Sequence, residues 1–144
     1  MAVTAKLYGY GALNAFLGLV DWDTNAIKVA LIQNTYTPDQ DVDDEYADVS
    51  AYELASGSGY TTGGATLGTK TNTYTAVGNI VLFGAADTSW AAITFTGIRY
   101  AVIYDSVTNK LIGYVDFGAD QAITSGTFQI NWHDTDKIVK ATVS

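Results

Sequence analysis

The chain has 144 residues, of which 48% are hydrophobic and 15% charged, and its formal net charge is −8 at pH 7. This length is typical of one domain with a single hydrophobic core, so we predict a single domain over 1–144. Its seven Lys and Arg residues cannot form a basic stripe, which excludes nucleic acid as an expected partner, and the absence of cysteine excludes disulfides and thiolate chemistry.

The first twenty residues contain an apolar stretch, 7–20, which is too short to span a bilayer and lacks a following cleavage pattern, so we expect no membrane partner. On a helical wheel its large apolar side chains share one side and its small residues the other. We predict a short helix in a docking segment, 1–20, which needs packing to persist because glycines interrupt it. The candidate partner contacts in this segment are Leu7, Tyr8, Tyr10, Leu13, Phe16 and Leu17.

The chain after residue 25 is organised in short β-type segments. Residues 26–33 are rich in aliphatic and β-branched side chains, which is typical of a largely buried strand. In residues 127–132, Phe128, Ile130 and Trp132 point to one side, so that side should be buried. The full set of strands predicted from this kind of pattern is 26–33, 79–83, 91–96, 98–105, 110–117, 127–132 and 137–143.

Turn residues between these runs predict hairpins. Asn109 can adopt the left-handed conformation that closes a short hairpin between 98–105 and 110–117. Residues 133–136 predict a similar turn between the last two strands. Because no long helical periodicity separates the strands, we predict an all-β, single-domain antiparallel β-sandwich or jelly-roll-like barrel with a short N-terminal helix.

The middle of the chain differs in composition, with few aliphatic residues and many glycines and threonines. We predict an irregular loop region over 34–64, followed by threonines that alternate with other residues up to position 75, which fits either a polar edge strand or a flexible linker. Tyrosines in polar loops suit protein or sugar contacts as well as a core, so Tyr36 and Tyr60 are further candidate contacts. Tyr100, Tyr104 and Tyr114 lie in predicted strands, where we expect sheet packing.

An acidic stretch, 37–50, holds six carboxylates, at Asp39, Asp41, Asp43, Asp44, Glu45 and Asp48. An EF-hand loop that began at Asp39 would need Gly at its sixth position and Glu at its twelfth, where the chain has Asp44 and Ser50. A nonstandard Ca²⁺ site and a solvated loop with a helical turn over 43–49 both remain open. We favour the solvated loop, and we expect no metal or other cofactor.

Motifs for catalysis are also missing. His133 is the single histidine, and no nucleophile elbow of the G-x-S-x-G type accompanies it. The glycine-rich run near residue 60 lacks the lysine and the βαβ context of a phosphate-binding loop. We therefore predict that the chain is not an enzyme. Because carboxylate pairs for glycoside hydrolysis have no fixed spacing in sequence, a cell-wall hydrolase is the least favoured alternative.

Four stretches occur in one order along nearly the whole chain: MAVTAKLYG, DWDTNAIKVALIQNTYTPDQD, SGSGYTTGGATL and IRYAVIYDSVTNKLIGYVDFGADQ. Together they resemble a family of small virion structural proteins of tailed bacteriophages, of the capsid decoration (cement), head-fibre or minor tail type. The family brings no catalytic motif to this sequence, and the acidity of residues 41–48 departs from it.

The resemblance implies a place in the virion, on the capsid surface. It implies a decoration or cement protein that binds the outside of the head shell and stabilises it, with the major capsid protein or another virion protein as partner. Oligomers are usually symmetric, so we also expect a homo-oligomer, either a dimer or a trimer. The alternative is a head-fibre or tail-associated module that contacts a host receptor or glycan.

Overall fold

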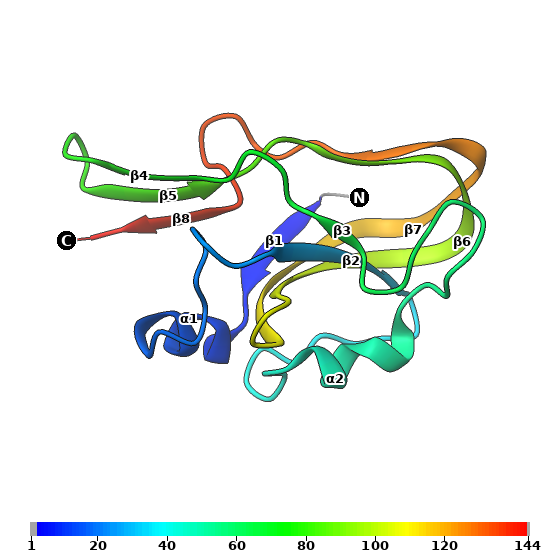
Figure 1. Ribbon diagram of the computed structural model, residues 1–144, viewed down its shortest axis with the longest axis horizontal. Coiled ribbons are helices and arrows are strands. Elements are labelled where there is room, and N and C mark those ends of the chain that lie inside the picture. Colours follow the sequence, from blue (N-terminus) through cyan, green and yellow to red (C-terminus); the bar gives the residue numbers. More distant parts are fainter. Residues whose placement is uncertain (1–2, 144) are drawn as a thin grey trace.

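The computed structural model describes residues 3–143, with 51% of residues in strands and 11% in helices. Two antiparallel sheets, with strand orders β1-β7-β6-β2-β3 and β4-β5-β8, confirm the prediction of an all-β, sandwich-like domain (Figure 1). The strands are β1 (Thr4–Leu7), β2 (Ile27–Gln33), β3 (Ala65–Thr66), β4 (Thr71–Thr75), β5 (Ile80–Gly84), β6 (Thr88–Asp105), β7 (Lys110–Ile130) and β8 (Val139–Thr142). The helices are α1 (Gly9–Phe16) and α2 (Tyr46–Val49), and α2 continues into a 3₁₀ turn at Ser50–Tyr52.

The two longest strands, β6 and β7, form a bent ribbon that contributes to both layers of the molecule. Their pairing shifts register several times between Trp90 and Tyr100, and Ala92 and Gly97 have positive φ there. Such bulges bend a strand pair sharply. In Figure 1 the ribbon runs along the upper layer, turns at the right-hand end and returns in the lower layer. The segments predicted at 91–96, 98–105, 110–117 and 127–130 do lie in strands, and 98–105 pairs antiparallel with 110–117 as predicted. Their prediction as four separate strands is wrong, because the irregular positions bend β6 and β7 without ending them.

At β2, both faces of the five-stranded sheet are covered by other parts of the protein. Five of the seven residues of β2 are fully buried, which explains why this strand is a continuous hydrophobic run and not an alternating one. A first core lies between the two layers and contains Trp22, Ile27, Val29, Leu31, Trp90, Ile103, Ile112 and Trp132. A second core lies on the opposite face, beneath the segments around the two helices, and contains Tyr8, Ala30, Ile32, Tyr36, Val49, Val102 and Leu111.

The turn predictions are confirmed in one place and corrected in another. Asn109 has φ of 61° and closes the hairpin between β6 and β7 as predicted. Residues 133–136 do form a turn, but the strands on either side of it, β7 and β8, belong to different sheets and do not pair. This turn therefore carries the chain from one sheet to the other.

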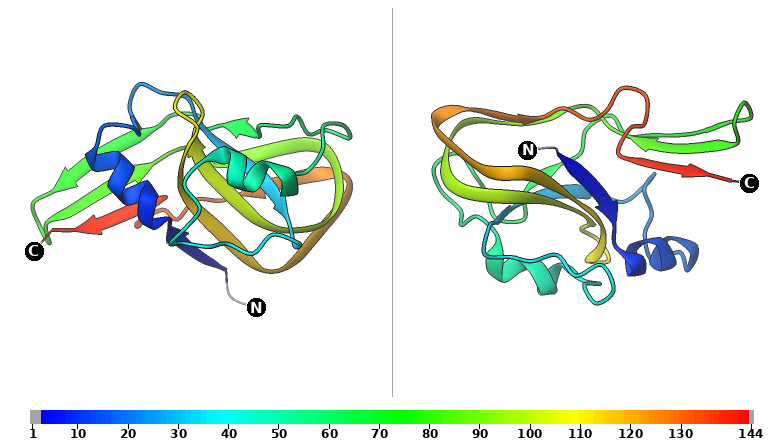
Figure 2. Two further views of the ribbon diagram at one scale, coloured as in Figure 1. Left: turned by 90° about the horizontal axis from the view of Figure 1, so that it is seen from below. Right: turned by 180° about the vertical axis from the view of Figure 1, so that it is seen from behind.

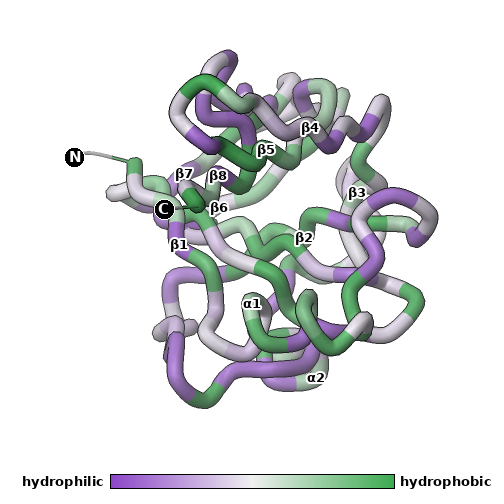
Figure 3. The backbone as a smooth tube through the Cα atoms, turned by 90° about the vertical axis from the view of Figure 1, so that its left-hand side faces the viewer, coloured by the Kyte–Doolittle hydropathy of each residue, from purple (hydrophilic) through white to green (hydrophobic). Residues whose placement is uncertain are grey.

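The threonine-rich part of the middle region is strand β4, at the edge of the three-stranded sheet. All five of its residues are exposed, and it pairs only with β5. This confirms the polar edge strand and rules out a flexible linker at these positions. Figure 3 shows the contrast between hydrophilic β4 and hydrophobic β5 beside it.

The N-terminal segment begins with a strand that the sequence pattern did not reveal. β1 forms the end of the five-stranded sheet by pairing with β7, and the helix α1 follows it directly. Two views in Figure 2 show α1 at the surface, beside the strands. Residues 1–2 of the predicted docking segment, and residue 144, lie outside the described residues.

Candidate binding surface

The orientation of α1 is the reverse of that of an ordinary amphipathic helix. Its buried residues are Gly11 and Asn14, both from the small and polar side. A Cβ atom at Gly11 would lie 2.5 Å from the carbonyl oxygen of Ile112 in β7, so only glycine lets the helix approach the strand this closely. Asn14 fixes the same side by donating from Nδ2 to Asp44 Oδ1 at 2.5 Å. The predicted helix therefore turns its apolar side toward solvent.

The apolar side of α1 and the residues that follow it form one exposed surface, which we call the α1 surface. Phe16 is 94% exposed and Leu17 is 62% exposed. The whole surface consists of Tyr10, Leu13, Phe16, Leu17 and Leu19. Residues 9–20 include no charged side chain. A contiguous uncharged apolar patch at the surface is typical of a protein interaction site.

Three of the residues predicted as partner contacts are core residues. Tyr8, Tyr36 and Tyr60 are each at most 4% exposed. The Tyr8 and Tyr36 hydroxyl groups lie 2.8 Å apart, and the Tyr60 hydroxyl accepts a hydrogen bond from the Leu31 N–H. Their assignment to a contact surface is therefore corrected, because a buried tyrosine can satisfy its hydroxyl inside the protein. Leu7 is partly exposed at the end of β1, and Tyr10, Leu13, Phe16 and Leu17 lie on the α1 surface.

The acidic stretch serves mainly to hold its own fold. Asp48 accepts hydrogen bonds from the N–H groups of Asp44 and Glu45, which is a capping interaction at the start of α2. Lys110 donates to both Asp44 and Glu45 at 2.8 Å. The Lys110 ammonium holds the pKa of the Asp44 carboxyl below its usual range. The helical turn predicted within 43–49 is confirmed as α2.

Two buried carboxylates, Asp43 and Glu53, connect the acidic stretch and the residues that follow it to buried tyrosines through hydrogen bonds. Asp43 accepts a hydrogen bond from the Tyr36 hydroxyl at 2.5 Å. Glu53 accepts hydrogen bonds from the hydroxyls of Tyr46 and Tyr60. Burial, reinforced by the neighbouring carboxylates, raises the pKa of all three tyrosines far above the usual value. These contacts are structural, since each carboxylate is buried and accepts its hydrogen bonds from protein donors.

The described residues offer no assembled metal or histidine site. No cluster of three or more metal-ligating side chains occurs among residues 3–143. His133 is exposed, and its Nδ1 accepts hydrogen bonds from the N–H groups of Thr135 and Asp136, which stabilise the turn. Among those residues, too, no helix has the length and apolar character needed to cross a bilayer.

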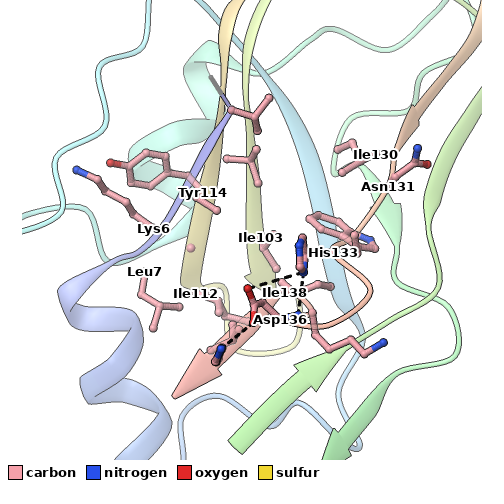
Figure 4. Close-up of a pocket in the computed structure, with 18 of the residues that line it drawn as sticks. Lys6, Leu7, Ile103, Ile112, Tyr114, Ile130, Asn131, His133, Asp136 and Ile138 are labelled. Carbon is pink, nitrogen blue, oxygen red and sulfur yellow. Dashed lines mark hydrogen bonds and ion pairs between the residues drawn. The ribbon is translucent and has the colours of Figure 1, made fainter. Parts of the chain in front are cut away.

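A groove of about 670 Å³ opens between β1 and the 129–140 segment (Figure 4). Its floor consists of apolar residues of the first core, including Ile103, Ile112 and Ile130. A smaller hollow of about 200 Å³ lies under α1. Leu7, Ile112 and Val139 line both hollows, so they adjoin. No sequence pattern indicates the groove, because residues far apart in the chain form it.

These features define the class of the protein as a single all-β, sandwich-like domain with an exposed apolar helix. No protein-family model, curated protein or solved structure matches the chain.

Proposed function

We propose that this chain is a structural binding protein that docks on a larger assembly through the α1 surface, and that it has no enzymatic role. The observation that carries the proposal is the reversed orientation of α1. A surface helix normally buries its apolar side. Here Gly11 lies against β7 while Phe16 and Leu17 are exposed, so covering them requires another molecule.

The assembly that we propose is the head of a tailed bacteriophage, with the chain as a decoration or cement protein on the outer surface of the shell. This step depends on the sequence resemblance described above. A symmetric shell repeats one docking site many times, so a modest apolar patch on each copy adds up to substantial stabilisation. The rigid double-layered fold, with its buried hydrogen-bonded carboxylates, suits a part that must keep its shape.

The proposal of docking through α1 is tested with the double variant Phe16→Asp/Leu17→Asp. Two charges on the α1 surface should lower incorporation into virions at least about ten-fold, because they would be desolvated at the contact. Thermal unfolding should stay unchanged, since both side chains are exposed in the free protein. The measurement is quantitative immunoblotting of virions purified from a phage that encodes the chain, complemented with each variant.

Val77→Asp is the matched control, because Val77 is also a strongly exposed apolar residue but lies in the β4–β5 turn. It should be incorporated like the natural chain. Two results would overturn the proposal: absence of the natural chain from purified virions, or normal incorporation of the double variant. A natural copy number far below that of the major capsid protein would instead favour a fibre or tail position over a cement.

A further inference from the structure

The groove beside β1 carries an unusual share of the positive charge of the chain. Lys137 and Lys140 line it together with the single histidine, His133, and Lys6 lies at its rim in β1, with its side chain directed to the opposite face of the sheet. These are three of only seven Lys and Arg residues in a chain of net charge −8. The carboxylate among the lining residues is Asp136, which Lys140 already pairs at 2.8 Å. Within residues 3–143, neither Lys6 nor Lys137 forms an ion pair.

One wall of the groove is the open edge of the five-stranded sheet. The N–H of Tyr8 donates to the carbonyl oxygen of Ile112 in β7. In an antiparallel pair the hydrogen-bonding direction alternates, so the backbone groups of Ala5 and Leu7 point away from β7. The Leu7 carbonyl confirms this direction, because it accepts a hydrogen bond from the Gln40 side chain. Within residues 3–143, the N–H groups of Ala5 and Leu7 and the carbonyl of Ala5 have no hydrogen-bond partner, so they can pair with another strand.

The floor of the groove adds an apolar component. Ile112, Val115 and Trp132 belong to the first core, yet they also line the groove. Side chains in β1 alternate between the two faces of the sheet, which places Ala5 and Leu7 on one face and Lys6 on the other. In Figure 4 the Lys6 side chain points away from the apolar residues of the floor. A strand added beside β1 would therefore meet apolar surface on one face and a lysine on the other.

From these three features we propose that the groove binds an extended peptide segment of a partner protein, in which acidic and apolar residues alternate, as an added strand along the free edge of β1. Apolar side chains of this peptide enter the groove. Carboxylates on its other face pair with Lys6, and carboxylates near its end reach Lys137 and Lys140 on the opposite wall. Strand addition of this kind takes its affinity from main-chain hydrogen bonds and its specificity from alternate side chains. The site is separate from the α1 surface and does not depend on the virion assignment.

The test uses a fluorescein-labelled synthetic peptide of alternating glutamate and valine, titrated with the full chain and followed by fluorescence anisotropy. We expect saturable binding that weakens with added salt, because exposed ion pairs are screened. The same peptide with alternate backbone nitrogens methylated keeps its charge but loses one hydrogen-bonding edge, so it should bind at least about ten-fold more weakly. A peptide of alternating lysine and valine should not bind.

Protein variants locate the site. Lys6→Glu/Lys137→Glu should weaken binding by at least about ten-fold, because it reverses two rim charges. Lys28→Glu is the matched control, since Lys28 also lacks an ion pair among the described residues but lies outside the groove, and it should stay within about two-fold. Thermal unfolding confirms that each variant is folded.

Three outcomes would overturn the proposal: no binding of the glutamate peptide, equal binding of the methylated peptide, or equal loss in Lys28→Glu and the double variant. Amide chemical shifts give an independent readout, because strand addition should perturb Ala5 and Leu7 most. Phe16→Asp/Leu17→Asp should leave peptide binding unchanged, which separates a failure of this proposal from a failure of docking through α1.

Discussion

The two short helical regions at the surface differ in which side chains they bury. α1 and its C-terminal extension carry no charge and expose large apolar residues, with Phe16 almost wholly in solvent. The neighbouring acidic segment, 39–53, is rich in carboxylates, but Asp43 and Glu53 are buried and hydrogen-bonded to tyrosines. The acidic segment resembles a metal or catalytic site in the sequence, but its buried carboxylates stabilise the fold. The α1 surface, in contrast, is exposed to solvent.

The difference has a simple physical origin. A buried carboxylate is tolerated only when protein donors replace its water, and the tyrosines supply them. A helix can be held by its small side when glycine permits close approach, and Gly11 does this against β7. The two segments are also joined, since Asn14 of α1 donates to Asp44. Disturbing each one separately should therefore show which properties belong to folding and which to binding.

The largest expected effect is loss of stability in alkali. Burial and nearby carboxylates raise the pKa of Tyr36 and Tyr60, and burial raises the pKa of Tyr104 to about 12. Above pH 10 the unfolded chain releases these phenolic protons while the folded chain keeps them, so the free energy of unfolding falls as pH rises. Each such tyrosine contributes about 1.4 kcal/mol of loss per pH unit above about 10. Urea denaturation at a series of pH values from neutral to strongly alkaline measures the slope.

Tyr60→Phe refines this prediction. The variant should be less stable at neutral pH, because Glu53 and the Leu31 N–H lose a partner. Its alkaline slope should nevertheless be shallower than that of the natural chain, because one buried ionisable group is gone. A free energy of unfolding that stays level well above pH 10 would contradict the structural role given to the tyrosine–carboxylate contacts.

Patterns of two or three adjacent residues predicted the local structure of this fold well. The buried strand β2, the hairpin at Asn109 and the polar edge strand β4 all follow from periodicity or turn chemistry. The bent ribbon of β6 and β7 could not be predicted in this way. Gly97 looks like a turn residue in the sequence, but β6 remains paired with distant residues of β7 on both sides of it. The strand β1 was also missed, since its four residues are all exposed and show no alternation of burial.

The candidate site was predicted only in part, for a related reason. A helical wheel shows which residues of α1 share a side, but it does not show which side faces the sheet. That choice depends on the contact between Gly11 and β7, a hundred residues away in the chain. Similarly, loop tyrosines suit either a surface or a core. The sequence does not show that Asp43 and Glu53 are buried, or that they accept hydrogen bonds from Tyr36 and Tyr60 in the core.

The second-largest expected effect is a loss of stability when the packing of α1 against β7 is disturbed. Gly11→Ala would normally stabilise a helix by up to about 1 kcal/mol. Here we expect the opposite sign, a loss of about 2 kcal/mol, because the new Cβ would collide with backbone oxygens of Leu111 and Ile112 that cannot move without disturbing β7. Chemical denaturation gives the sign directly. Ala12→Ser, at an exposed position on the same helix, should change stability by less than about 0.5 kcal/mol.

The smallest expected effect tests whether the charges of the acidic segment matter to the α1 surface at all. Lys110→Met removes the ammonium group that pairs with Asp44 and Glu45, and should lower the free energy of unfolding only slightly, because the Glu45 side chain is 53% exposed and solvent screens the pair. Lys140→Met breaks the more exposed pair with Asp136 and should lower the free energy of unfolding less than Lys110→Met does.

Acid titration shows how the pairing of Asp44 with Lys110 changes the pH dependence of the free energy of unfolding. Since Lys110 lowers the pKa of Asp44 in the folded chain, the unfolded chain takes up protons first as pH falls below about 4, and the natural chain loses stability there. Lys110→Met should lose less over the same range. Incorporation through α1 should be unchanged in this variant, because Gly11 still holds the helix on β7. If incorporation fell as far as it does in Phe16→Asp/Leu17→Asp, the acidic segment would be part of the contact, and the two segments would form one surface.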